Sequence, residues 1–224
     1  LEFRRVLFRS SHGFVIWRTP LALNIRITSV EAFRVAMPLV TVFTSGGKSK
    51  NVANGVVVRI VASDGSVGIS SVDPSSRAVF PERAEDLLLT INTKLKPLVV
   101  GQTPSNINLI SSLIANDTAR QLGARAAIEV ACVDLTCRRI GMPLYEYLGG
   151  AVRSKVDFNG WVGELPPAEA VAEAKRWASA GFKSMKIKVG SDLVQDIERV
   201  QAIRDAVGTA VRRSEEHTSE LQSP

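Results

Sequence analysis

After Gly149-Gly150, short apolar runs typical of strands alternate with segments of helical periodicity. Few folds are compatible with this alternation. Strand, helix, strand and helix joined by short loops predict parallel strands with crossover helices. The repeat of about 27 residues fits a (β/α)8 barrel, which needs eight such units. A doubly wound sheet begins in the same way, but no G-x-G-x-x-G motif follows either strand. We expect, in order, a strand over 155–161, a helix opened by Pro166-Pro167 and ended by Gly181, a strand over 182–189, and a helix capped by Ser191 and ended by Gly208.

The first half of the chain shows strand patterns followed by helix patterns. Apolar runs on either side of Asp64-Gly65 predict a hairpin. Three strands followed by three helices predict an α+β module whose sheet is three-stranded and antiparallel. The expected elements are a strand over 24–35 that ends at Met37-Pro38, a flexible loop over 39–51, strands over 56–61 and 67–70, and helices over 81–97, from 103 onward and over 123–140.

The two ends of the chain differ in character from its middle. Both resemble translated sequencing-adapter DNA, so we expect residues 1–24 to be a disordered or artefactual head and residues 212–224 to be an artefactual tail. The middle divides at the Gly-Gly pair into a domain over 25–150 and the start of a barrel over 151–211. We therefore expect a fragment of a longer protein, inactive by itself because two βα units cannot close a barrel.

Composition narrows the classes of function and partner. Hydrophobic residues at 45% and charged residues at 22% are typical of a soluble globular protein. The net charge of +6 is scattered, with no basic block among aromatic residues, so we expect no nucleic-acid partner. No run of eighteen apolar residues occurs, so we expect no membrane partner. Cys132 and Cys137 lie about 7.5 Å apart along one predicted helix, too far for a disulfide, which favours a cytoplasmic protein. Assembly into a homo-oligomer stays open.

Histidine is nearly absent from the chain. The two histidines, His12 and His217, lie at or inside the atypical ends. The middle of the chain therefore lacks the histidine that a Ser-His-Asp triad, a histidine-based zinc site or a histidine base would need. Acid-base chemistry falls to Lys, Asp, Glu or Tyr.

Two lysines share one face of the strand predicted over 182–189. A strand repeats every two residues, so Lys186 and Lys188 lie on one face, with Met185 and Ile187 on the other. Two neighbouring ammonium groups are costly to bury in a sheet covered on both faces. One interpretation makes one lysine a base whose neutral form is favoured by the other. The alternative is an edge strand with solvated lysines, in a non-catalytic α/β binding or interaction protein.

Three motifs resemble the mandelate racemase/muconate lactonising branch of the enolase superfamily. They are AAIEVACVDL over 126–135, GMPLYEYLGG over 141–150 and AGFKSMKIKVG over 180–190. The resemblance covers residues 25–208 and implies an α+β capping domain followed by a (β/α)8 TIM-like barrel, truncated here after two βα units. It also implies a Mg²⁺-dependent enzyme that removes the proton α to a substrate carboxylate through an enolate. Racemases or epimerases, dehydratases and cycloisomerases share that step.

The resemblance assigns roles to individual residues. In the family, the second lysine of K-x-K on the second barrel strand is an acid-base catalyst, which is Lys188 here. The first, Lys186, favours the neutral form of its neighbour and helps to hold the substrate carboxylate. The flexible loop of the capping domain closes over the small-molecule carboxylate, which makes Thr44, Ser45 and Lys48 substrate-binding candidates. The Mg²⁺ ligands lie on the third, fourth and fifth barrel strands of the family and the opposing acid-base residue on the sixth, so we assign no metal ligand in this chain.

Overall fold

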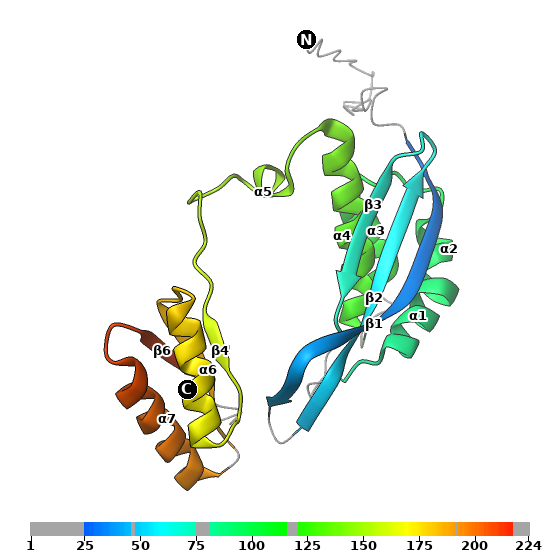
Figure 1. Ribbon diagram of the computed structural model, residues 1–224. Coiled ribbons are helices and arrows are strands. Elements are labelled where there is room, and N and C mark those ends of the chain that lie inside the picture. Colours follow the sequence, from blue (N-terminus) through cyan, green and yellow to red (C-terminus); the bar gives the residue numbers. More distant parts are fainter. Residues whose placement is uncertain (1–24, 46–47, 75–80, 116–120, 191, 217–224) are drawn as a thin grey trace, which may run out of the picture. The chain divides into compact units, whose positions relative to one another are not determined.

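The computed structural model describes residues 25–45, 48–74, 81–115, 121–190 and 192–216 (Figure 1). The chain separates into two compact units. Among the described residues, the first unit comprises 25–35 and 54–150, and the second comprises 36–53 and 151–216. Each unit has its own hydrophobic core.

A three-stranded antiparallel sheet of β1 (Ile27–Ser45), β2 (Lys48–Ala62) and β3 (Val67–Val72) opens the chain, as predicted. The strands follow one another in the order β1-β2-β3, and Val61 of β2 lies opposite Val67 of β3. The turn between these two residues carries Gly65 at φ 80°, a backbone conformation that favours glycine. The predicted Asp-Gly hairpin is therefore confirmed.

The loop predicted over 39–51 is wrong, since the structure continues both strands almost to the Gly46-Gly47 pair. Pro38 lies inside β1 rather than ending it. Proline is tolerated there because β1 is an edge strand of this sheet, where a missing N–H need not cost a ladder hydrogen bond. The polar residues around the pair stay extended because β1 and β2 hydrogen-bond to each other.

The helices of the first unit follow the sheet in sequence. They are α1 (Ala84–Thr90), the π-helical turn η2 (Ile91–Leu95), α2 (Lys96–Val99), α3 (Ile107–Ala115), α4 (Leu122–Ile140) and α5 (Leu144–Tyr147). The prediction that Pro97 ends the first helix is wrong, because the chain stays helical through η2 and α2 as far as Val99. Pro97 stands in the first turn of α2, where a helix has little need of its N–H. The next helix begins at Ile107, not Thr103, whose hydroxyl accepts a hydrogen bond from Arg26 at 2.9 Å.

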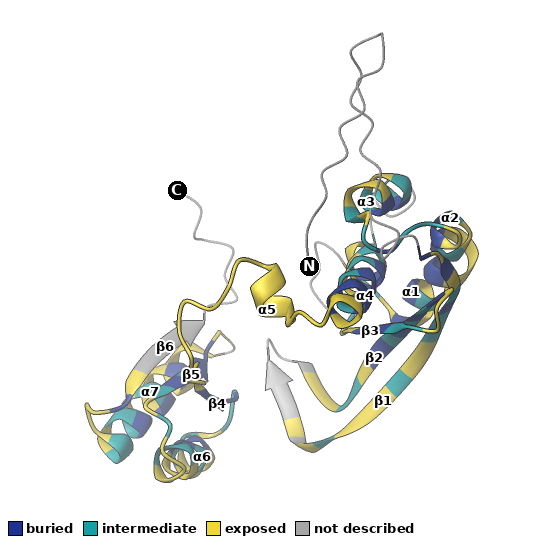
Figure 2. Ribbon diagram, turned by 90° about the horizontal axis from the view of Figure 1, so that it is seen from above, coloured by how far each residue is buried: buried dark blue, intermediate teal, exposed yellow. Residues whose placement is uncertain are grey.

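Helix α4 packs on the sheet and closes the core of the first unit. The predicted buried stripe is confirmed, since Ala124, Ile128, Ala131 and Leu135 have no solvent exposure. Figure 2 shows dark blue residues where the helices face the sheet and yellow ones on the outer sides of the helices. Gly141 ends the helix at φ 68°, as its position in the sequence predicts.

The second unit is built on a parallel sheet. Its elements are β4 (Gly160–Val162), α6 (Pro167–Ser179), β5 (Ser184–Lys188), α7 (Leu193–Val207) and β6 (Arg212–Glu216). The strand order is β4-β5-β6, and β5 pairs in parallel with both neighbours. This is the predicted succession of two βα units, although β4 is shorter than the strand expected over 155–161. Residues 212–216, which the sequence assigns to an artefactual tail, extend the sheet by one strand.

Helix α7 buries a different face from the one that its apolar residues predict. The apolar residues Leu193 and Ile197 are 75% and 62% exposed. The buried positions are Asp196, Arg199 and Ile203. The N-cap is Asp192, which accepts a hydrogen bond from Gln195 N–H at 2.9 Å, while Ser191, the predicted cap, lies outside the described residues. Within the described ranges, no helix combines the length and apolar character that crossing a membrane requires.

Candidate active site

The lysine strand β5 is the centre of the parallel sheet. Its neighbours are β4 and β6, so the edge-strand interpretation is wrong. Met185 and Ile187 are fully buried in the core that α6 and α7 cover. Strand alternation then places Lys186 and Lys188 together on the opposite face of the sheet. Lys188 is only 8% exposed, and Lys186 is partly buried.

Lys188 is the last residue of β5. The carboxyl ends of parallel strands meet at one edge of a sheet. In (β/α)8 barrels the catalytic residues lie at that edge. The ladder between β4 and β5 runs from Gly160 opposite Met185 to Val162 opposite Ile187, and the ladder between β5 and β6 continues to Lys188 opposite Glu216. The candidate base therefore stands at the carboxyl end of the central strand.

A buried charge pair on α7 holds the backbone at this edge. Asp196 and Arg199 are joined by an ion pair of 2.5 Å, with side chains 10% and 2% exposed. The guanidinium of Arg199 donates to the carbonyl of Lys188 at 3.2 Å and to that of Leu165 at 2.5 Å. The carboxylate of Asp196 accepts from the N–H of Gly190 at 2.6 Å. The pair thus connects the end of β5 with the loop that follows β4.

Sequence reasoning missed both members of this pair. Charged residues on a helix usually face water, so nothing in the helix pattern marked these two as buried. The available signal was an aspartate and an arginine three residues apart, on one helix face, in the helix directly after the lysine strand.

The other predicted site residues are less fully described. Thr44 and Ser45 end β1 and Lys48 begins β2, but their side chains lie outside the described part of the structure. Their role in substrate binding stays a prediction. For the metal, the described residues contain no group of three or more His, Cys, Asp or Glu side chains that could hold an ion.

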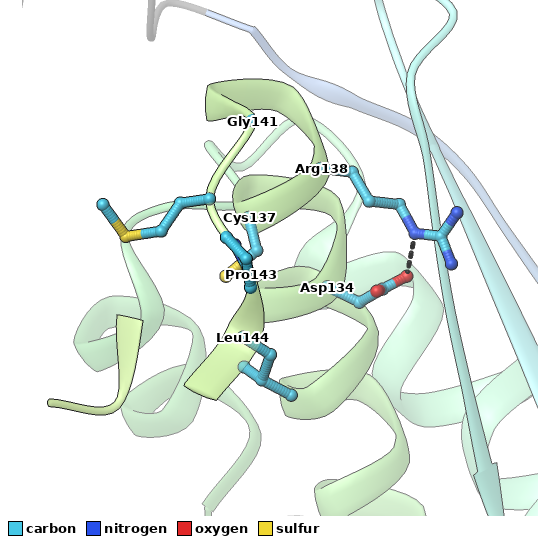
Figure 3. A pocket seen from close by; sticks show the side chains of 7 residues that line it. Asp134, Cys137, Arg138, Gly141, Pro143 and Leu144 are labelled. Atoms are coloured by element: carbon cyan, nitrogen blue, oxygen red, sulfur yellow. Dashed lines mark hydrogen bonds and ion pairs between the residues drawn. The ribbon is translucent and has the colours of Figure 1, made fainter. Parts of the chain in front are cut away.

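A pocket of 340 Å³ opens in the first unit at the carboxyl end of α4 (Figure 3). Asp134 and Arg138 line it and form an ion pair of 2.8 Å, and Asp134 also accepts from the N–H of Ile69 at 2.8 Å. Burial raises the pKa of the Cys137 thiol, which lines the same pocket, and the Asp134 carboxylate adds to the shift. Neither Lys186 nor Lys188 lines this pocket. Its aspartate, Asp134, joins α4 to β3 through the hydrogen bond to Ile69.

A second cavity of 610 Å³ lies in the second unit. It is lined by Lys183 and Ser184, at the start of β5, and by Phe158, in the segment before β4. Lys188 ends the same strand, so this cavity belongs to the opposite edge of the sheet. Neither cavity contains Lys186 or Lys188 among its lining residues.

Comparison with known proteins identifies the family. Residues 24–149 match the mandelate racemase / muconate lactonizing enzyme N-terminal domain, and residues 169–213 match the enolase C-terminal domain-like family. The chain belongs to the mandelate racemase/muconate lactonizing enzyme family. The second match lies within the second unit of this family member and contains the lysine strand.

Relatives of this family member include epimerases and a cycloisomerase. The L-Ala-D/L-Glu epimerase of Bacillus subtilis is 32% identical, with 84% of this chain and 51% of the epimerase aligned. The muconate cycloisomerase 1-2 of Acinetobacter lwoffii is 29% identical, with 84% of this chain and 49% of the relative aligned.

A solved structure of an epimerase also resembles this chain in fold. The dipeptide epimerase of Enterococcus faecalis V583, complexed with Mg and the dipeptide L-Leu-L-Tyr, superposes with a TM-score of 0.82 at 30% identity. The alignment covers 86% of this chain and 54% of that structure. The chain thus spans about half the length of the relatives it matches.

Proposed function

We propose that the complete protein removes the proton on the carbon α to a substrate carboxylate, with Lys188 as the base. The observation that carries the proposal is the placement of Lys186 and Lys188 on one face of the central strand, at its carboxyl end, in a member of this family. Epimerases and a cycloisomerase among the relatives support the reaction class.

The two lysines have different parts in the proposed reaction. Lys188, the more deeply buried, takes the α-proton onto Nζ, for which it must first be neutral. Lys186, two residues earlier on the same face, donates charge-assisted hydrogen bonds to the substrate carboxylate. The low exposure of Lys188 keeps water away from the proton-transfer step.

The remaining parts of the proposal concern the complete protein. We propose that a full (β/α)8 barrel supplies the other strands and that Mg²⁺ is the cofactor, held by residues outside those described here. The complex of the E. faecalis dipeptide epimerase with Mg supports this proposal. Thr44, Ser45 and Lys48 are proposed to contact the substrate, and dipeptides are the first substrates to test, given the relatives.

The test uses the full-length protein with Mg²⁺ in deuterated buffer. Dipeptides, N-succinyl amino acids and muconate are offered, and loss of the α-proton is followed by NMR. We expect exchange with at least one class, and a fall of about 10³-fold or more in the Lys188→Ala variant.

Lys183→Ala is the matched control, because Lys183 precedes the same strand but is exposed at its opposite end. This variant should retain exchange within about twofold of the parent protein. Equal exchange in the parent protein and in the Lys188→Ala variant would refute the assignment of Lys188.

A further inference from the structure

The charge pair Asp196–Arg199 is an unusual feature of α7. Arg199 is among the largest fully buried side chains of the described residues, with 2% of its side chain exposed. Removing two charges from water is costly, and an apolar pair of similar volume often stabilises a protein equally well. Stability alone therefore gives a weak reason for this pair. Its backbone contacts give a stronger one.

The contacts of the pair converge on the residue proposed as the base. Arg199 Nη1 donates to the carbonyl of Lys188, and Asp196 Oδ2 accepts from the N–H of Gly190. The two bonds bracket Val189, the residue that directly follows the end of β5.

The guanidinium also fixes this stretch against a second strand. Arg199 Nε donates to the carbonyl of Leu165, in the loop that leaves β4. A planar guanidinium with five donors in a rigid fork can hold two carbonyls and a carboxylate in one geometry, which a lysine ammonium cannot reproduce. One side chain thus joins the loop after β4 to the carboxyl end of β5.

We propose that Asp196 and Arg199 are positioning residues for Lys188: they fix the backbone at the end of β5 so that the neutral lysine amine meets the α-proton in the reactive geometry. This inference rests on the proposed function. Neither residue touches the substrate; both act through the carbonyl of Lys188 and the N–H of Gly190. A shift of about 1 Å in a reacting group can cost about 10²-fold in rate.

The test compares two conservative variants of the full-length protein. Arg199→Lys keeps the positive charge beside Asp196 but loses the fork, and Asp196→Asn keeps an acceptor but loses the charge. We expect kcat for α-proton exchange to fall about 10- to 100-fold in both variants, with KM within about threefold. In the absence of substrate, amide hydrogen exchange over residues 186–190 should accelerate at least about tenfold.

Ala174→Gly is the matched control for a general loss of stability. Ala174 is buried in the core of the second unit on α6 and has no contact with the carbonyl of Lys188 among the hydrogen bonds described above. Glycine at a buried helix position lowers the melting temperature. This variant should leave kcat within about twofold and amide exchange over 186–190 unchanged.

The outcomes separate this inference from the proposed function. If Lys188→Ala abolishes exchange while Arg199→Lys keeps the parent kcat, positioning by the pair is refuted and the function stands. If amide exchange over 186–190 is the same in Arg199→Lys and in the parent protein, positioning is refuted irrespective of activity. If Ala174→Gly loses as much kcat as Arg199→Lys at the same melting temperature, the effect is one of stability and the inference fails.

Discussion

Gly68 offers the sharpest test of the packing in the first unit. It lies in β3, where the strand meets α4. A methyl group at this position would lie 2.1 Å from the carbonyl oxygen of Ala131, 2.6 Å from Cβ of Leu135 and 2.7 Å from its backbone nitrogen. Two of these three atoms belong to the helix backbone, so rotating a side chain cannot remove the clash.

The size of the effect follows from these distances. The contact with Ala131 must lengthen from 2.1 Å to at least 3.0 Å, so α4 must move by about 0.9 Å from the strand. Overpacking of this kind costs about 1–3 kcal/mol, and we expect Gly68→Ala to reach about 3 kcal/mol because backbone must shift. For a unit of this size the melting temperature should fall by roughly 10 °C.

The assay is calorimetric unfolding of the full-length protein, with two companion variants. Gly101→Ala meets open space at φ 85°, so it should show only the backbone cost of about 1–2 kcal/mol. Adding Leu135→Ala to Gly68→Ala should not restore stability, because the contact with the Ala131 carbonyl remains. An unchanged melting temperature in Gly68→Ala, or full recovery in the double variant, would refute the reasoning.

Three further predictions concern binding, thiol chemistry and pH. Lys48→Ala in the full-length protein should raise KM about three- to tenfold with kcat within about twofold, as expected for lost uniform binding; an unchanged KM would count against its role. Burial, and secondarily the Glu129 carboxylate, raises the pKa of Cys132 from 9.0 to about 12, so iodoacetamide should alkylate this thiol only after unfolding, and labelling of the native protein would contradict that. Hydrogen bonds from Ser66 lower the pKa of Asp64 from 3.8 to about 2. Its stabilising contribution is therefore present above pH 3.8 and lost as pH falls towards 2, so the melting temperatures of Asp64→Asn and the parent protein should converge in that window.

Local chemistry made several elements predictable from sequence. The Asp64-Gly65 turn, the stripe of α4 and the glycine at its end each depend on residues close together in the chain. The lysine strand was also predictable, because its alternation and its flanking Gly181 and Gly190 are local. These features can be predicted without knowing which other helices and strands pack against them.

Features decided by distant partners were not predictable from the residues themselves. The stretch predicted as a loop is extended because β1 and β2 pair over it, and neither strand's own sequence shows that pairing. Pro97 reads as a helix end, yet the π-helical turn before it allows the helix to continue. A periodic pattern reports apolar faces only, so it could not reveal that Asp196 and Arg199 are buried.

The two hydrophobic cores draw on separate parts of the sequence. Every buried residue of the first core lies between Ile25 and Leu135, and every one of the second lies between Val162 and Val211. During synthesis, domains generally fold as units with the N-terminal one first. The first core is thus complete in sequence before the lysine strand leaves the ribosome, and its collapse need not wait for the parallel sheet. The slower step, pairing of parallel strands across intervening helices, then takes place after the first core has formed.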